Sequence, residues 1–130
     1  MESFLHFQSS AGSRLVRVSQ VVEVIPMVAL QHEQTDSNQF CGLLNYRGKI
    51  IPVFDLLRAD ENAYLDIKAF LIVTQCNGSD VALIACEVNQ IYELMDEAVQ
   101  IIAPANLAHF EVAKVEGEMV RVVNLQEFVA

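Results

Sequence analysis

The chain repeats one stretch of its sequence, and this repeat restricts the possible folds more than any other feature. Residues 48–56 align without a gap with residues 117–125, and both copies begin with glycine. Two shorter matches recur at a similar spacing of about 66 to 70 residues: Val22–Val24 with Tyr92–Leu94, and Phe4–Leu5 with Phe70–Leu71. Half of a 130-residue chain buries too little apolar surface to be stable alone. We therefore expect two similar units that pack on a shared core.

The residues around the first copy are typical of a β-hairpin. Phe40–Leu44 and Lys49–Phe54 are apolar runs, and Asn45–Gly48 lies between them. Gly48 can take a positive φ without steric penalty, so it is the expected pivot of the turn. Asn45 can hydrogen-bond nearby backbone groups and help to define the corner.

Five further residues have predicted structural roles. Pro52 cannot donate a backbone hydrogen bond, so its strand should lie at a sheet edge or carry a bulge there. Asp55 ends the same run, as a cap or turn residue would. Asn77–Gly78 is a strong hairpin signal, and Gly117 begins the second copy of the repeat.

Apolar spacing predicts the remaining elements. A helical spacing occurs twice, at Val18, Val21, Val22 and Ile25, and again at Val88, Ile91 and Tyr92. Ser19 is a suitable N-cap for the first of these helical turns. Residues 31–39 are polar and predict a surface loop. Strands are expected at residues 4–8, 14–18, 70–74 and 81–85, with a last strand in the second copy of the repeat.

The sequence thus predicts an all-β protein of two small antiparallel barrels around a shared hydrophobic core, with short helical turns. We expect one domain, residues 1–130, with subdomain 1 at about 1–62 and subdomain 2 at about 63–130. An exchange of terminal strands between the two barrels stays open.

Charge and composition limit the class of partner. The net charge of −9 repels phosphate backbones, so nucleic acid is not expected as a partner. The apolar runs are too short to span a bilayer, and the N-terminus lacks the pattern of a signal peptide, so we expect a cytoplasmic protein without membrane insertion. Five cations lie in the first half and could form a local basic patch: Arg14, Arg17, Arg47, Lys49 and Arg58.

No pattern of catalytic or metal-binding residues is found. His6, His32 and His109 lie far apart, and no nucleophile elbow, phosphate loop or zinc spacing is present. His6 lies in an apolar strand, where a face or core histidine is expected. The three cysteines, Cys41, Cys76 and Cys86, are expected to be buried small apolar residues. We predict no catalytic residue, no metal and no cofactor.

The hairpin also carries a resemblance to a known family. Its motif Asn-x-Arg-Gly-x-x-x-Pro-x-x-Asp-Leu resembles the signature of the CheW family, adaptors of bacterial chemosensory arrays; it comprises Asn45, Arg47, Gly48, Pro52, Asp55 and Leu56. A weaker resemblance extends from Phe4 to Leu125. It implies two SH3-like, five-stranded barrels around a shared hydrophobic centre.

Arg47 is the main candidate for partner binding. A hairpin tip is a rigid mount, a guanidinium offers a planar donor fork, and Arg is enriched at interface hot spots. The resemblance places the receptor-contacting Arg of the family at this position. The predicted partner-binding residues are Arg47, Asn45, Tyr46 and Lys49. Tyr46 replaces an aliphatic residue common in the family, and either packs in the same way or tunes partner choice; Asn45 more simply shapes the turn.

The resemblance implies a non-catalytic adaptor. It would couple the cytoplasmic tip of a chemoreceptor to the regulatory domain of a CheA-type histidine kinase, at membrane-associated receptor arrays, with self-association also possible. Two alternatives stay open: a divergent CheW-like protein of a non-motility chemosensory pathway, and a small ligand-binding or enzymatic β-barrel. A deep pocket with convergent polar groups would favour the second alternative.

Overall fold

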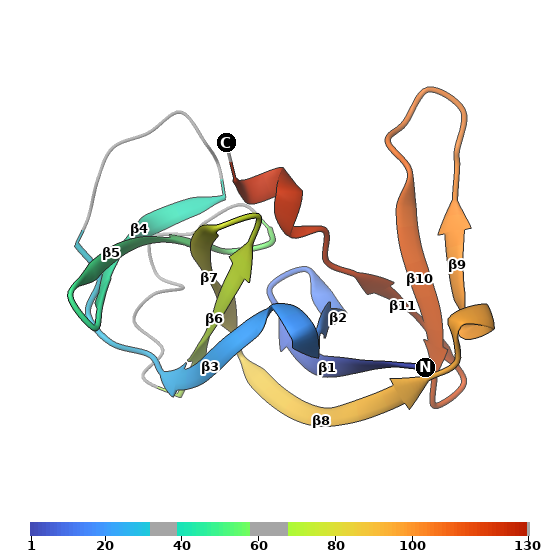
Figure 1. The fold of residues 1–130 in the computed structure, drawn as a ribbon, viewed down its shortest axis with the longest axis horizontal. Helices are drawn as coiled ribbons and strands as arrows, with labels where there is room; N and C mark the ends of the chain where they lie inside the picture. The colour runs from blue at the N-terminus through green and yellow to red at the C-terminus, as the bar shows by residue number, and fades with distance from the viewer. Residues whose placement is uncertain (32–38, 58–67, 130) are drawn as a thin grey trace.

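The computed structural model describes residues 1–31, 39–57 and 68–129, which form two β-sheets (Figure 1). The six-stranded sheet contains, in spatial order, β8 (Glu87–Leu94), β1 (Glu2–Ser9), β2 (Gly12–Arg17), β11 (Glu118–Val122), β10 (Phe110–Val115) and β9 (Val99–Ile102). The five-stranded sheet contains β3 (Val21–Pro26), β6 (Phe70–Cys76), β7 (Ser79–Ala85), β5 (Lys49–Phe54) and β4 (Phe40–Tyr46). The predicted all-β class is confirmed. Residues 32–38 of the predicted polar loop and the predicted subdomain boundary at residues 62 and 63 lie outside the described residues.

The two sheets exchange hairpins. β3, β4 and β5 come from the first half of the chain, but their sheet is completed by β6 and β7 from the second half. In the same way, the β1–β2 hairpin completes the sheet of β8 to β11. The strand orders match if β3, β6, β7, β5 and β4 are equated with β8, β1, β2, β11 and β10, which leaves β9 as an extra strand. The exchange left open by the sequence thus involves whole hairpins.

The strand pairing differs from the purely antiparallel prediction. β5 pairs with β7 in parallel, and β11 pairs with β2 in parallel. Strands joined by a tight turn must be antiparallel, but β5 and β7 are not consecutive, and neither are β2 and β11. The exchanged hairpin enters each sheet with an orientation that its own turn does not fix. One sheet also has six strands where five were expected.

The exchanged hairpins form the shared core. Leu5, Phe7 and Val16 of the β1–β2 hairpin pack against Ile72, Val81 and Leu83 of the β6–β7 hairpin. Figure 1 shows these hairpins between the two outer groups of strands. Each sheet also encloses a core of its own, around Leu71 and Val53 in one and around Phe4 and Leu15 in the other. The predicted shared core therefore exists, and it joins two filled barrel interiors.

The predicted helical turns are mostly strands. Only Val18–Gln20 forms a 3₁₀ turn (η1), and β3 begins directly after it; Ser19 lies inside this turn and is not its N-cap. The second helical spacing lies in β8. Both strands lie at a free edge of their sheet, and their β-branched residues favour extended backbone over helix. Two further 3₁₀ turns among the described residues are Asp96–Ala98 (η3) and Leu125–Phe128 (η4). No helix among the described residues has both the length and the apolar character needed to cross a membrane.

Candidate partner-binding site

The β4–β5 hairpin closes in a two-residue turn at Arg47 and Gly48. Arg47 has a φ of 50° and Gly48 a φ of 82°, as a type I′ turn requires. The predicted pivot at Gly48 is thus one half of the turn. Arg47 is the other half, in a left-handed conformation that a non-glycine residue seldom adopts. Such strained residues are frequent at functional sites, so the conformation of Arg47 marks it as a candidate.

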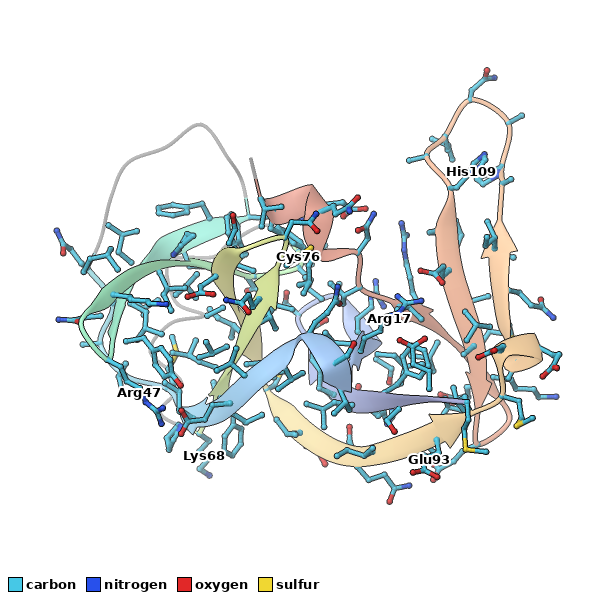
Figure 2. All side chains as sticks on the ribbon, viewed as in Figure 1. Arg17, Arg47, Lys68, Cys76, Glu93 and His109 are labelled. Atoms are coloured by element: carbon cyan, nitrogen blue, oxygen red, sulfur yellow. The ribbon has the colours of Figure 1, made fainter. Side chains whose placement is uncertain are left out.

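A carboxylate on the neighbouring edge strand holds the tip. Arg47 Nη2 lies 2.9 Å from Glu23 Oε2, and the Tyr46 hydroxyl donates to the same oxygen. The Arg47 guanidinium also lies 5.2 Å from the centre of the Tyr46 ring. The hydrogen bond to Glu23 raises the pKa of Tyr46, because it is lost when the phenol ionises. Figure 2 shows Arg47 at the outer end of the hairpin, near β3. The Arg47 side chain nevertheless remains 73% exposed.

The other two predicted partner-binding residues lie beside this tip. Lys49 Nζ is 3.4 Å from Asp80 Oδ2, and the Lys49 side chain is exposed. Asn45 is exposed and lies in β4 opposite Ile50. In the described part of the chain, the Asn45 side chain makes no hydrogen bond, so its expected role in the turn is wrong. A type I′ turn is defined by its two central residues and needs no side chain from the strand before it.

The glycines predicted to be structural all serve the same turn type. Gly78 has a φ of 80° after Asn77 at 52°, and Gly117 has a φ of 85° after Glu116 at 50°. No atom lies within 4 Å of a Cβ built on Gly78 or Gly117, so the φ angle, not space, requires glycine at these positions. The chain therefore uses one turn geometry at the tips of three hairpins.

Pro52 does not lie in an edge strand, in contrast to the prediction. β5 lies between β4 and β7, and the bulge of the β4–β5 pair is in β4, between Phe40 and Gly42, one pair beyond Pro52 and its partner Leu43. The proline is tolerated because the ladder between β5 and β7 is short and includes only Val53 and Phe54. The missing N–H of Pro52 thus falls just outside this ladder.

Asp55 links the two units. Asp55 is only 2% exposed; the Ser10 hydroxyl donates a hydrogen bond to its carboxylate, and the backbone N–H of Leu57 donates to Ser10 Oγ at 3.1 Å. Ser10 lies in the turn between β1 and β2, so this bond joins the end of β5 to the exchanged hairpin. Burial raises the pKa of Asp55, and the hydrogen bond from Ser10 opposes the rise. Sequence reasoning identified Asp55 as the end of the strand but not its partner Ser10.

Glu23 is the site residue that sequence reasoning missed. It lies in β3 between Val22 and Val24, which are 51% and 36% exposed. The sequence signal for Glu23 is a single carboxylate between two valines in a strand. Successive side chains of a strand project from opposite faces, so β3 presents Val22 and Val24 to solvent on one face and Glu23 to the Arg47 tip on the other.

The described histidines and cysteines lie apart from the Arg47 tip. The described part of the chain contains no group of His, Cys, Asp and Glu side chains that could hold a metal ion. Cys41 and Cys76 are buried as expected, but Cys86 is exposed between β7 and β8. His6 is half-buried and lies edge-on to Tyr92, with ring centroids 5.9 Å apart. His109 is exposed, and His32 lies outside the described residues.

Comparison with known proteins agrees with this fold. Residues 3–130 match the family model of the CheW-like domain. The crystal structure of the scaffolding protein TtCheW from Thermoanaerobacter tengcongensis is similar, with a TM-score of 0.78 and 19% sequence identity, over 95% of this chain and 84% of that chain. At this identity, the likeness concerns the fold. A search of curated proteins found no match to this sequence.

Proposed function

Because the chain belongs to the CheW-like domain family, we propose that it is a non-catalytic adaptor between a chemoreceptor and a CheA-type histidine kinase. The family is one of scaffolds that interact with both kinds of protein. In this proposal the protein works in the cytoplasm, at the membrane-associated arrays that contain the receptors. Its role is to hold two partners in a fixed relation, which requires exposed binding surfaces and no reacting group.

The conformation of Arg47 is the observation that supports this proposal most. The chain places a charged residue where Asn or Gly would be easier to accommodate, and leaves its side chain 73% exposed. The ion pair with Glu23 is solvent-exposed, and such pairs contribute little to stability. Glu23 and Tyr46 instead restrict the orientations of the guanidinium. A pre-oriented guanidinium loses less entropy on binding a partner's acceptor groups.

The second partner would bind at the free sheet edges. β3 and β8 are both edge strands, and both expose apolar side chains: Val22 and Val24 in β3, and Ile91 in β8. Unpaired backbone groups allow strand addition, and the exposed side chains add apolar area. We propose that one of these edges contacts the regulatory domain of the kinase.

The filled barrel interiors argue against the alternative of a ligand-binding or enzymatic barrel. Leu71 and Val53 occupy one interior, and Phe4 and Leu15 the other, and all four are completely buried. A small-molecule site needs a concave space with a few convergent polar groups. Core side chains occupy the place where such a site would lie in a small barrel.

The Arg47→Glu substitution tests the receptor contact. We expect the variant to fold, because Glu116 occupies the equivalent position of an identical turn with the same φ of 50°. Receptor binding should fall by a factor of ten or more, since truncation of an interface hot spot costs ~2 kcal/mol or more and a reversed charge adds repulsion. The measurement is a pull-down with the cytoplasmic tip of the receptor, with circular dichroism as the folding check.

Lys114→Glu provides the matched control. It makes the same change in net charge, at an exposed position in β10 of the other sheet. The control variant should bind the receptor tip like the unchanged protein. If Arg47→Glu also binds undiminished, Arg47 is not part of the receptor contact.

A further inference from the structure

Two arginines lie side by side where the β1–β2 hairpin joins the β10–β11 hairpin. Arg14 in β2 and Arg121 in β11 are direct partners in the parallel ladder between these strands. Paired positions in neighbouring strands project from the same face of the sheet, and the two strands lie about 5 Å apart. Two like charges so placed repel each other, and proteins normally avoid this arrangement or neutralise it.

Among the described residues, no carboxylate neutralises this pair. Arg14 Nη1 donates to the Ser13 carbonyl at 2.8 Å, and Arg121 lies over the Phe110 ring, 4.1 Å from its centre. Within the described residues, neither arginine has a carboxylate within ion-pair distance. Arg17 shows the contrast, because Glu2 and Glu111 bind it at 2.9 and 2.7 Å.

The pair faces a small polar cavity between the two sheets. Its volume is about 160 Å³, and Arg14, Arg121, Gln39, Leu56, Glu127 and Phe128 contribute to its wall. Leu56 follows β5 and Gln39 precedes β4, so the cavity spans both sheets. Partial burial and the charge of Arg121 both lower the pKa of Arg14, which indicates that its cationic form lacks compensation.

We propose that this cavity binds a carboxylate group, presented by a Glu or Asp side chain of a partner protein. Paired guanidiniums offer convergent N–H donors that match the oxygens of an anion. The cavity is smaller than the ~300 Å³ at which small-molecule sites begin, but it can hold a single side-chain head group. Leu56 and Phe128 supply apolar wall for the methylene stem, and the carboxylate of Glu127 in the wall repels a dianion such as phosphate more strongly than a singly charged carboxylate. This site is separate from Arg47 and does not depend on the receptor contact.

The test is an NMR titration of the full chain that follows the Nε–H signals of the arginines. Three probes are compared at constant ionic strength: acetyl-Gly-Glu-Gly-amide, acetyl-Gly-Gln-Gly-amide and inorganic phosphate. We expect saturable shifts of the Arg14 and Arg121 signals with the Glu peptide, and affinities at least fivefold weaker for the other two probes. Equal or tighter binding of phosphate, or equal shifts with the Gln peptide, would overturn the assignment of a carboxylate.

Variants locate the site. Arg121→Gln should weaken binding of the Glu peptide at least fivefold, and Arg14→Gln should do the same. Lys114→Gln, the loss of an exposed cation elsewhere in the same sheet, should leave it unchanged. Because Arg121 is exposed, its variant tests the site even if Arg14→Gln does not fold. Equal loss in Arg121→Gln and Lys114→Gln would show general charge attraction and would refute the site.

Discussion

The tips of the β4–β5 and β10–β11 hairpins are equivalent in geometry and opposite in charge. Arg47 and Glu116 both have a φ of 50°, and each is followed by a glycine with a φ of 82° or 85°. Each tip also contacts the edge strand of its own sheet. Arg47 bonds to Glu23 in β3, and Glu116 accepts hydrogen bonds from Tyr92 and Gln90 in β8.

The strand ladders show how close this equivalence is. When the pair Val53–Ala82 of β5 and β7 is superposed on the pair Val122–Leu15 of β11 and β2, the other strands follow from their ladders. Leu71 then corresponds to Phe4, and Glu23 corresponds to Gln90. The two tips therefore touch the same position of the edge strand. The fold thus fixes the geometry of the corner, and the charge at the corner is free to vary. This difference is why we assign receptor binding to one tip and not to both.

The largest expected effect tests whether the two barrels are one folding unit. Phe4→Ala and Leu71→Ala remove equivalent, completely buried side chains from the two barrel interiors, and each should cost about 2–5 kcal/mol. Because the exchanged hairpins share a core, each variant should shift a single urea transition, followed by circular dichroism. Ile50 and Met119 are exposed and equivalent to each other in the two copies of the repeat, so Ile50→Ala and Met119→Ala should change the free energy of unfolding little. Two separate transitions would show that the barrels unfold independently.

The next prediction compares Asp55 with Asn124, its counterpart in the second copy of the repeat. Asn124 Oδ1 accepts from Gln126 N at 3.1 Å, so the neutral amide caps the chain at this position. The raised pKa of Asp55 means that the folded protein holds this proton more tightly than the unfolded chain does. The contribution of Asp55 to the free energy of unfolding is therefore greatest below its ordinary pKa near 3.8. It is lost as the pH rises through the pKa of the folded state.

Asp55→Asn should remove this loss. The free energy of unfolding of the variant minus that of the unchanged protein should be larger at pH 7 than at pH 4, as measured by urea unfolding at both pH values. Asn can still accept the hydrogen bond from Ser10, so the link to the β1–β2 turn is kept. Asn124→Ala, which alters the counterpart without a charge, is the control and should show no such pH dependence. A variant with unchanged pH dependence would mean that burial of Asp55 does not govern its titration.

The sequence predicts the turns well because each one depends on adjacent residues. Gly48 and Gly78 were identified from the local pattern, and type I′ geometry at both follows from it. The repeat is also visible, but two of its matches are out of register: the first strand by one residue, with Phe70 in place of Leu71, and Val22–Val24 by three, because Glu23 corresponds to Gln90 and not to Glu93. A shift of one residue changes the face of the sheet, and Leu71 is completely buried while Phe70 is only partly buried.

Interactions between distant segments were beyond the reach of the sequence. The bond between Ser10 and Asp55, and that between Glu23 and Arg47, depend on which hairpin enters which sheet. The parallel pairs have the same origin, since no local signal reports the partner of an exchanged hairpin. The apolar spacing of β3 also fits a helix, because spacing alone does not show that only one face of the strand is buried.

The smallest expected effect concerns the strain at the two tips. Arg47→Asn and Glu116→Asn should each stabilise the fold by about 0.5–1 kcal/mol, because Asn takes a positive φ more easily and already occupies this turn position at Asn77. Strain relief should exceed the loss of the exposed contacts at either tip, which are worth little. Urea midpoints measure the stability, and a receptor-tip pull-down measures the binding. Both variants should gain similar stability, but only Arg47→Asn should lose receptor binding. If both lose binding, or neither does, the charge at the corner is not what distinguishes the two tips.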